Sequence, residues 1–268
     1  MKRLLAIFIL ILVIPFSVVA AAVDDITARA EAGDADAQFA LADMYKNGDG
    51  VAQSDTAAAQ WYGKAADLGH LNAKLAFARA YLSGRGVEMD KCRGLYYAQN
   101  AAELGNVDAQ WVTGVLYKRG LCGGSNSAKA QQWLELADAN GNRFAASSLA
   151  MSYFAGADGF EKDFQKSVYW LKKAMTHENS TFDMTSNAFM IAIFYYDGGY
   201  GITQDNQQAM NWLYTAVKIA EHGKPTASPF ALKSYQGYTD IKSKVDATAP
   251  AYMKVIASAA ADDWWQQN

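Results

Sequence analysis

The sequence repeats itself every 36 residues, and this period restricts the fold more than any other property of the chain. It is seen first in four glycines, Gly33, Gly69, Gly105 and Gly141. Three further columns keep the same step and hold alanine (Ala37, Ala73, Ala109, Ala145), tyrosine (Tyr45, Tyr81, Tyr117, Tyr153) and a second glycine (Gly48, Gly84, Gly120, Gly156). A fixed period of this length is typical of proteins that stack one small structural unit on the next.

Each unit is predicted to consist of two α-helices. In the first unit, Ala37, Leu41 and Tyr45 lie four residues apart, so their side chains share one face of a helix. The second helix has a comparable face, formed by Ala58, Trp61, Tyr62 and Ala65, and later units repeat it as Ala130, Trp133, Leu134 and Ala137, then Ser167, Trp170, Leu171 and Ala174. A single helical hairpin cannot bury such faces, whereas stacked hairpins bury them between neighbours.

Residues that begin and end helices recur with the same period. Aspartates that can cap free backbone N–H groups stand at the predicted starts of second helices, at Asp55, Asp90, Asp163 and Asp205. The 36-residue glycines follow the second helices, where a left-handed backbone is needed. The pair Gly48 and Gly50 is predicted to turn the chain between the two helices. Cys122 and Asp158 replace the second glycine of this pair in the third and fourth units, which leaves room for a different loop path there.

The predicted fold is all-α, a right-handed α/α superhelical solenoid of about five helical hairpins over residues 23–223, with a helical C-terminal cap over residues 224–268. The fifth unit is displaced by extra residues at 177–183. Its first helix is predicted from Tyr196, Gly199 and Gly201, and its second from Trp212. Residues 24–32 resemble an isolated second helix, which would cap the first unit.

The first 22 residues have the features of a cleavable secretory signal peptide. Lys2 and Arg3 precede an apolar run that reaches Val19, and three alanines follow. Cleavage after Ala20 and cleavage after Ala22 both fit. An uncleaved membrane anchor is the alternative, but the apolar run is short for a full span, and no later segment is long and apolar enough to cross a membrane. We therefore expect a bacterial protein that is periplasmic or secreted.

Residues 37–69 resemble the Sel-one-like repeat (SLR) family, an α-solenoid relative of the tetratricopeptide repeat. They follow the pattern A-x7-Y-x2-G-x-G-V, then a capping aspartate, then A-x2-W-Y-x-K-A-A-x2-G. The resemblance extends over about residues 24–222. It implies an adaptor that binds other proteins or holds complexes together, and it supplies no catalytic residues to transfer to this chain.

The residues themselves predict no catalytic, metal or cofactor site. The three histidines, His70, His177 and His222, lie at or beyond predicted helix ends, where we expect them to be exposed, and none has the companions of a zinc site. No nucleophile elbow, phosphate loop or dinucleotide fingerprint is present. Removal of the leader takes away two positive charges and changes the net charge from −3 to −5, which argues against nucleic acid as a partner. We expect a monomer that is not an enzyme.

Four residues outside the repeating columns are candidates for binding a partner. Trp111 takes a position held by other apolar residues in earlier units, and Phe144 takes one held by polar residues. Together with Arg79 and Lys118 they are predicted to line a binding face, because interface centres favour aromatic residues and arginine. The alternative is that the two aromatic side chains only fill space between irregular units.

The two cysteines, Cys92 and Cys122, are predicted to form one disulfide between neighbouring units. An even number of cysteines in an exported chain favours pairing, and both fall at the same loop edge of the stack. The bond would contribute about 3–4 kcal/mol in the chain-entropy model. Two free thiols are the alternative. Mass spectrometry of the exported protein before and after reduction distinguishes them, and two alkylatable thiols without reductant would contradict the prediction.

The predicted function is an exported scaffold that binds a protein or peptide on the concave face of the solenoid. One rival is a peptidoglycan- or glycan-binding envelope module, which would use aromatic platforms such as Trp111. A less favoured rival is an enzyme acting on envelope polymer, which would need clustered acids or a nucleophile that the sequence does not supply.

Overall fold

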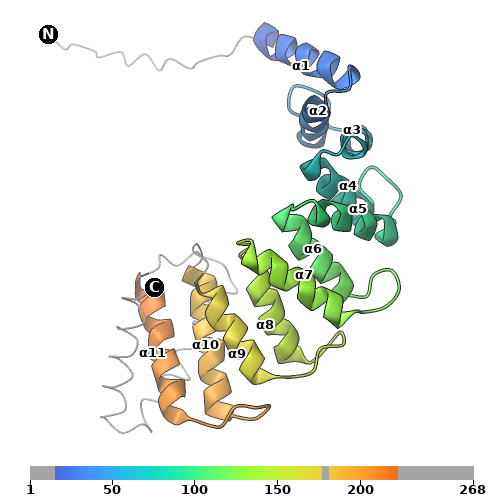
Figure 1. Ribbon diagram of the computed structural model, residues 1–268. Helices are drawn as coiled ribbons and strands as arrows, with labels where there is room; N and C mark the ends of the chain where they lie inside the picture. The colour runs from blue at the N-terminus through green and yellow to red at the C-terminus, as the bar shows by residue number, and fades with distance from the viewer. Residues whose placement is uncertain (1–15, 177–180, 223–268) are drawn as a thin grey trace, which may run out of the picture. The chain divides into compact units, whose positions relative to one another are not determined.

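The computed structural model describes residues 16–176 and 181–222, in which all regular elements are α-helices (Figure 1). The chain divides into two compact units, residues 1–106 and 107–268. The first unit holds α1 (Phe16–Glu31), α2 (Ala35–Asn47), α3 (Asp55–Asp67), α4 (Leu71–Ser83) and α5 (Lys91–Glu103). The second holds α6 (Val107–Lys118), α7 (Ser127–Ala139), α8 (Ala145–Ala155), α9 (Phe164–Ala174), α10 (Thr181–Asp197) and α11 (Asn206–His222).

Helices pair consecutively within each unit, which confirms the predicted stack of helical hairpins. The hairpins are α2–α3 and α4–α5 in the first unit, and α6–α7, α8–α9 and α10–α11 in the second (Figure 1). Helix α1 packs on α2 in the manner of an isolated second helix, with Ile26 and Ala30 against Leu41. The helix starts before residue 24, within the predicted leader. The predicted C-terminal cap and residues 177–180 of the extra loop lie outside the described residues.

Small side chains let the helices approach closely, and the tyrosine column fills the space between them. Many of the interface alanines, such as Ala65 and Ala73, are fully buried. Three of the column tyrosines, Tyr45, Tyr81 and Tyr117, are half-buried against apolar clusters, and Tyr153 is only 5% exposed. The repeating tyrosines therefore point into the stack and not into solvent.

One backbone hydrogen bond closes every hairpin loop. In each case the N–H of the residue before the second helix donates to the carbonyl of the tyrosine near the end of the first helix. The pairs are Ser54 to Tyr45 (2.8 Å), Asp90 to Tyr81 (3.0 Å), Asn126 to Tyr117 (3.0 Å), Asp163 to Tyr153 (3.0 Å) and Asp205 to Tyr195 (2.8 Å). The repeat is thus visible in the backbone as well as in the side chains.

Two sequence predictions are wrong by one residue at these loops. Ser54 caps α3, because its Oγ accepts from the Ala57 N–H at 3.2 Å, and Asp55 is the first helical residue. In the fifth unit the column tyrosine is Tyr195, whereas Tyr196 is 52% exposed. The fifth loop is one residue longer than the first, so aligning the glycines displaced the tyrosine.

The loops of the later units keep the left-handed backbone of the glycine loops. Gly50 and Gly86 have φ of 73° and 74°, and the equivalent residues Cys122, Asp158 and Tyr200 have φ of 78°, 57° and 46°. The backbone conformation at this position is therefore the same in all of these units, even where the residue has a side chain. A left-handed conformation destabilises a residue with a Cβ by about 1–2 kcal/mol.

Asp158→Gly is expected to stabilise the protein by about 0.5–1 kcal/mol, because glycine adopts this backbone without the steric cost. Asp158 is exposed, so little contact is lost. The free energy of unfolding in urea measures the effect. Asp49→Gly is the matched control, since Asp49 is an exposed loop aspartate outside the positive-φ region. If Asp158→Gly loses as much stability as Asp49→Gly, the left-handed backbone at Asp158 does not destabilise the protein.

A polar side-chain contact links the start of one first helix to the start of the next, 34 residues on. His70 Nε2 lies 3.4 Å from Asp36 Oδ1, and Asn106 donates to Asn72 at 3.0 Å. In the second unit Asn142 donates to Asp108 at 3.1 Å. His70 also caps α4 through Nδ1, which accepts from the Ala73 N–H at 3.0 Å. The expectation of an exposed His70 near a helix C-terminus is therefore wrong: it is a half-buried cap that links repeats.

Candidate functional site

The structure brings two of the predicted binding residues, Trp111 and Phe144, into contact in the second unit. Their ring centroids are 5.3 Å apart, and Trp111 Nε1 donates to the Ser148 hydroxyl at 3.0 Å. Trp111 is half-buried on α6, whereas Phe144, immediately before α8, remains 41% exposed. The hydrogen bond and the ring contact together fix the orientation of the indole.

Two neighbouring side chains extend this contact into a larger surface. The Arg143 guanidinium lies 4.5 Å from the centroid of the Phe144 ring, and Arg143 is exposed. Met151, which is 42% exposed, lies seven residues after Phe144 and so on the same side of α8. We name Trp111, Arg143, Phe144 and Met151 the α6–α8 surface.

Sequence reasoning missed Arg143 and Met151. Arg143 could have been found, because it directly precedes an aromatic residue outside the repeating columns, and cation–π pairing of arginine with an aromatic ring is common. Met151 occupies the column of Asp43, Arg79 and Val115. Its exposure depends on how α8 packs, which no local pattern gives.

The other two predicted residues lie elsewhere. Lys118 is the last residue of α6, seven residues and about 10 Å along the helix from Trp111. Arg79 is exposed on α4, in the first unit, where its carbonyl accepts from the Ser83 hydroxyl at 2.8 Å. Only Lys118 shares a helix with the α6–α8 surface.

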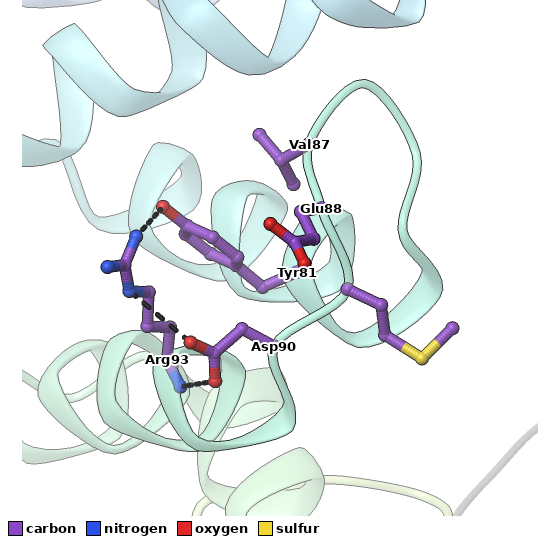
Figure 2. Close-up of a pocket in the computed structure, with 6 residues that line it drawn as sticks. Tyr81, Val87, Glu88, Asp90 and Arg93 are labelled. Carbon is purple, nitrogen blue, oxygen red and sulfur yellow. Dashed lines mark hydrogen bonds and ion pairs between the residues drawn. The ribbon is translucent and has the colours of Figure 1, made fainter.

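A pocket of about 400 Å³ lies in the first unit beside the loop that joins α4 to α5 (Figure 2). We name it the Glu88 pocket; it is lined by Tyr81, Val87, Glu88, Met89, Asp90 and Arg93. Arg93 Nη1 donates to the Tyr81 hydroxyl at 3.3 Å, and Nε lies 3.3 Å from an Asp90 carboxylate oxygen. The hydrogen bond to Tyr81 and, after it, the charge of Asp90 raise the pKa of Arg93.

A model of one protein family matches the chain in five consecutive stretches. The family is described as Sel1 repeat, and the matches cover residues 35–70, 72–106, 107–142, 144–176 and 188–218, more than half of the sequence. The chain belongs to the Sel1 repeat family. Each matched stretch overlaps one first helix and one second helix, so the five Sel1 repeats correspond to the five hairpins.

Solved structures with the same fold are similar to this Sel1 repeat protein. A protective antigen of uropathogenic Escherichia coli strains, described as displaying an SLR fold, is 22% identical with a TM-score of 0.57 over 92% of this chain. The chain spans 64% of that protein's length. A Sel1 repeat protein from Oxalobacter formigenes is 23% identical with a TM-score of 0.59, covering 78% of this chain and 87% of its own. Comparison with curated proteins gives no match.

In the described ranges, no three histidine, cysteine or acidic side chains lie together as metal ligands. Within the same part of the chain, no helix is long and apolar enough to cross a membrane.

The two cysteines lie at equivalent edges of their hairpins. Cys92 is the second residue of α5, where its N–H donates to Asp90 at 3.0 Å, and Cys122 follows α6 with a left-handed backbone. Neither is a free thiol among the described residues. The pairing of Cys92 with Cys122 stays a prediction, for which the mass measurement above is the test.

Proposed function

We propose that this Sel1 repeat protein is an exported, non-enzymatic scaffold that binds a protein or peptide partner through the α6–α8 surface. The observation that carries the proposal is the ordered group of Trp111, Phe144 and Arg143, in which apolar and cationic surface is held in place and left accessible.

This surface has the chemistry of an interface centre. Aromatic and arginine side chains contribute most to protein–protein affinity when neighbouring residues exclude water from them. Because Trp111 is already fixed by Ser148 and packed against Phe144, little side-chain entropy is lost on binding. Met151 adds an adaptable apolar contact on the same side of α8.

Export is supported by the leader-like first 22 residues and is part of the proposal. On this reading the mature chain lies in the periplasm or outside the cell.

A glycan-binding role is less well supported by the same residues. A sugar ring stacks on a flat, open aromatic face, whereas the Trp111 indole is half-buried and tilted by 38° against Phe144. The rings are better suited to receive an apolar side chain beside the Arg143 guanidinium. This difference separates the two candidate functions experimentally.

A photoreactive amino acid at position 144 is expected to give a discrete protein adduct in the periplasmic fraction of living cells. The same residue at position 169 is the control, because Tyr169 is an exposed aromatic residue on α9 (59%) outside the α6–α8 surface. Arg143→Ala combined with Met151→Ala should reduce the adduct at position 144 about tenfold or more, since each lost contact of this kind costs about 1 kcal/mol or more. Equal adducts at both positions, or an adduct that cell-wall hydrolases digest, would refute the proposal.

A further inference from the structure

The Glu88 pocket is a preformed site that the proposed function does not use. Its loop is held in place at several points: the Asp90 N–H donates to the Tyr81 carbonyl at 3.0 Å, and the Gly84 N–H donates to Ala80 at 2.8 Å. Gly86 packs so closely on the backbone at Asp55 that even a Cβ would overlap it. The Tyr81 ring stacks on the Tyr97 ring, with 5.9 Å between the ring centroids. A ligand would therefore meet walls that are already in position.

The charges of the pocket leave one carboxylate without a counterion. Arg93 and Asp90 balance each other, because Arg93 Nε lies 3.3 Å from Asp90 Oδ2. The other Asp90 oxygen accepts from the N–H groups of Cys92 and Arg93. Glu88 is exposed and forms no ion pair in the part of the chain that the structure describes. The lining therefore carries a net charge of about −1, and its uncompensated group is the Glu88 carboxylate.

The remaining lining is apolar and suits an alkyl chain. Met89 belongs to the lining and is 54% exposed. Val87 is half-buried, and Figure 2 shows the Tyr81 ring as a further wall. A ligand that matches this combination has an aliphatic stem and a cationic end. Lysine and arginine side chains have that form, since they place methylene groups on apolar surface and keep the charge at the tip.

We propose that the Glu88 pocket receives a lysine or arginine side chain of a partner protein, with the cation paired to Glu88 and the stem lying against Met89 and Tyr81. The site goes beyond the α6–α8 surface and shares no residue with it, so either can fail without the other.

The test uses a small probe and the methyl group of Met89 as reporter. The full mature chain is labelled with 13C at methionine methyl groups, and Met89→Leu assigns the signal. Nα-acetyl-lysine methylamide is titrated, with its neutral Nε-acetylated form as the matched probe. The Met89 signal is expected to shift and saturate with the charged probe only. Glu88→Gln should weaken this binding about threefold, the effect of one exposed ion pair.

Two further variants sharpen the result. Glu161→Gln removes the same charge at an exposed position in the second unit and should leave the affinity unchanged. Arg93→Gln removes the competing cation and should tighten binding about twofold. The proposal is overturned if the Met89 signal does not saturate up to the solubility limit of the probe, or saturates equally with the neutral probe. It is also overturned if Glu88→Gln binds as well as the parent, or if Nα-acetyl-glutamate methylamide binds more tightly than the lysine probe.

Discussion

Gly86→Ala is expected to destabilise the first unit by about 3 kcal/mol. Gly86 has φ of 74°, a region that costs a residue with a Cβ about 1–2 kcal/mol. The new methyl group would also overlap the Asp55 carbonyl at the start of α3 and lie 2.9 Å from the Thr56 nitrogen. Relieving such a clash with backbone typically costs a further 1–3 kcal/mol or so. The free energy of unfolding in urea measures the total.

Gly69→Ala is the matched control for this prediction. Gly69 has φ of 93°, yet a Cβ built there meets no atom within 4 Å. It should therefore cost only the backbone penalty of about 1–2 kcal/mol. If the two variants lose the same stability, the close approach of the loop to α3 does not contribute, and the rigid wall of the Glu88 pocket loses its support.

Lys173→Met is expected to destabilise the second unit by about 2–3 kcal/mol. Lys173 on α9 lies 2.5 Å from the Asp138 carboxylate on α7, and the Asp138 side chain is fully buried. Removing the ammonium leaves a buried negative charge without this partner, which costs about 3–5 kcal/mol in fully buried pairs. The Lys173 side chain is 38% exposed, so solvent reduces the effect. Urea unfolding at neutral pH is the measurement.

The double variant Asp138→Leu with Lys173→Met should recover most of the lost stability, because an apolar pair can replace a buried ion pair at little cost. Lys166→Met is the exposed control. Lys166 lies 3.5 Å from Asp163 at the surface, and its loss should cost less than about 1 kcal/mol. A double variant as unstable as Lys173→Met alone would show that the charge balance is not the cause.

The same pair predicts a loss of stability in alkali. The hydrogen bond and charge of Asp138 raise the pKa of Lys173 above its ordinary 10.5. A group whose pKa is raised by folding binds its proton more tightly in the native state, so its contribution is complete below pH 10.5 and disappears as the pH rises through the folded pKa.

The periodic part of the fold could be predicted because burial imposes it on every unit alike. Every 36 residues the same packing requirement selects a tyrosine, a closing glycine and an alanine face. The hairpins could be predicted from these three features. The exact residue that begins a helix or occupies a repeat column was harder to predict. Ser54 and Asp55 can both cap a helix, and Tyr195 and Tyr196 are chemically identical, so only the backbone hydrogen bonds decide between them.

The candidate sites were only partly predictable, because they depend on contacts between different units. Trp111 meets Ser148 and Phe144 across more than thirty residues, and the sequence marks them as unusual without placing them together. The pairing of Asp138 with Lys173 has the same character. The Glu88 pocket was missed because none of its residues departs from what a loop ordinarily contains; its shape comes from Gly86 resting on α3.

The hydrogen bond from the capping residue to the tyrosine carbonyl has a consequence for how such chains diversify. Since both groups belong to the main chain, the bond is indifferent to the side chains that lie between them, as serine, asparagine and aspartate donors already show at positions 54, 126 and 163. Each connecting segment can thus acquire new recognition chemistry by mutation while the scaffold stays intact.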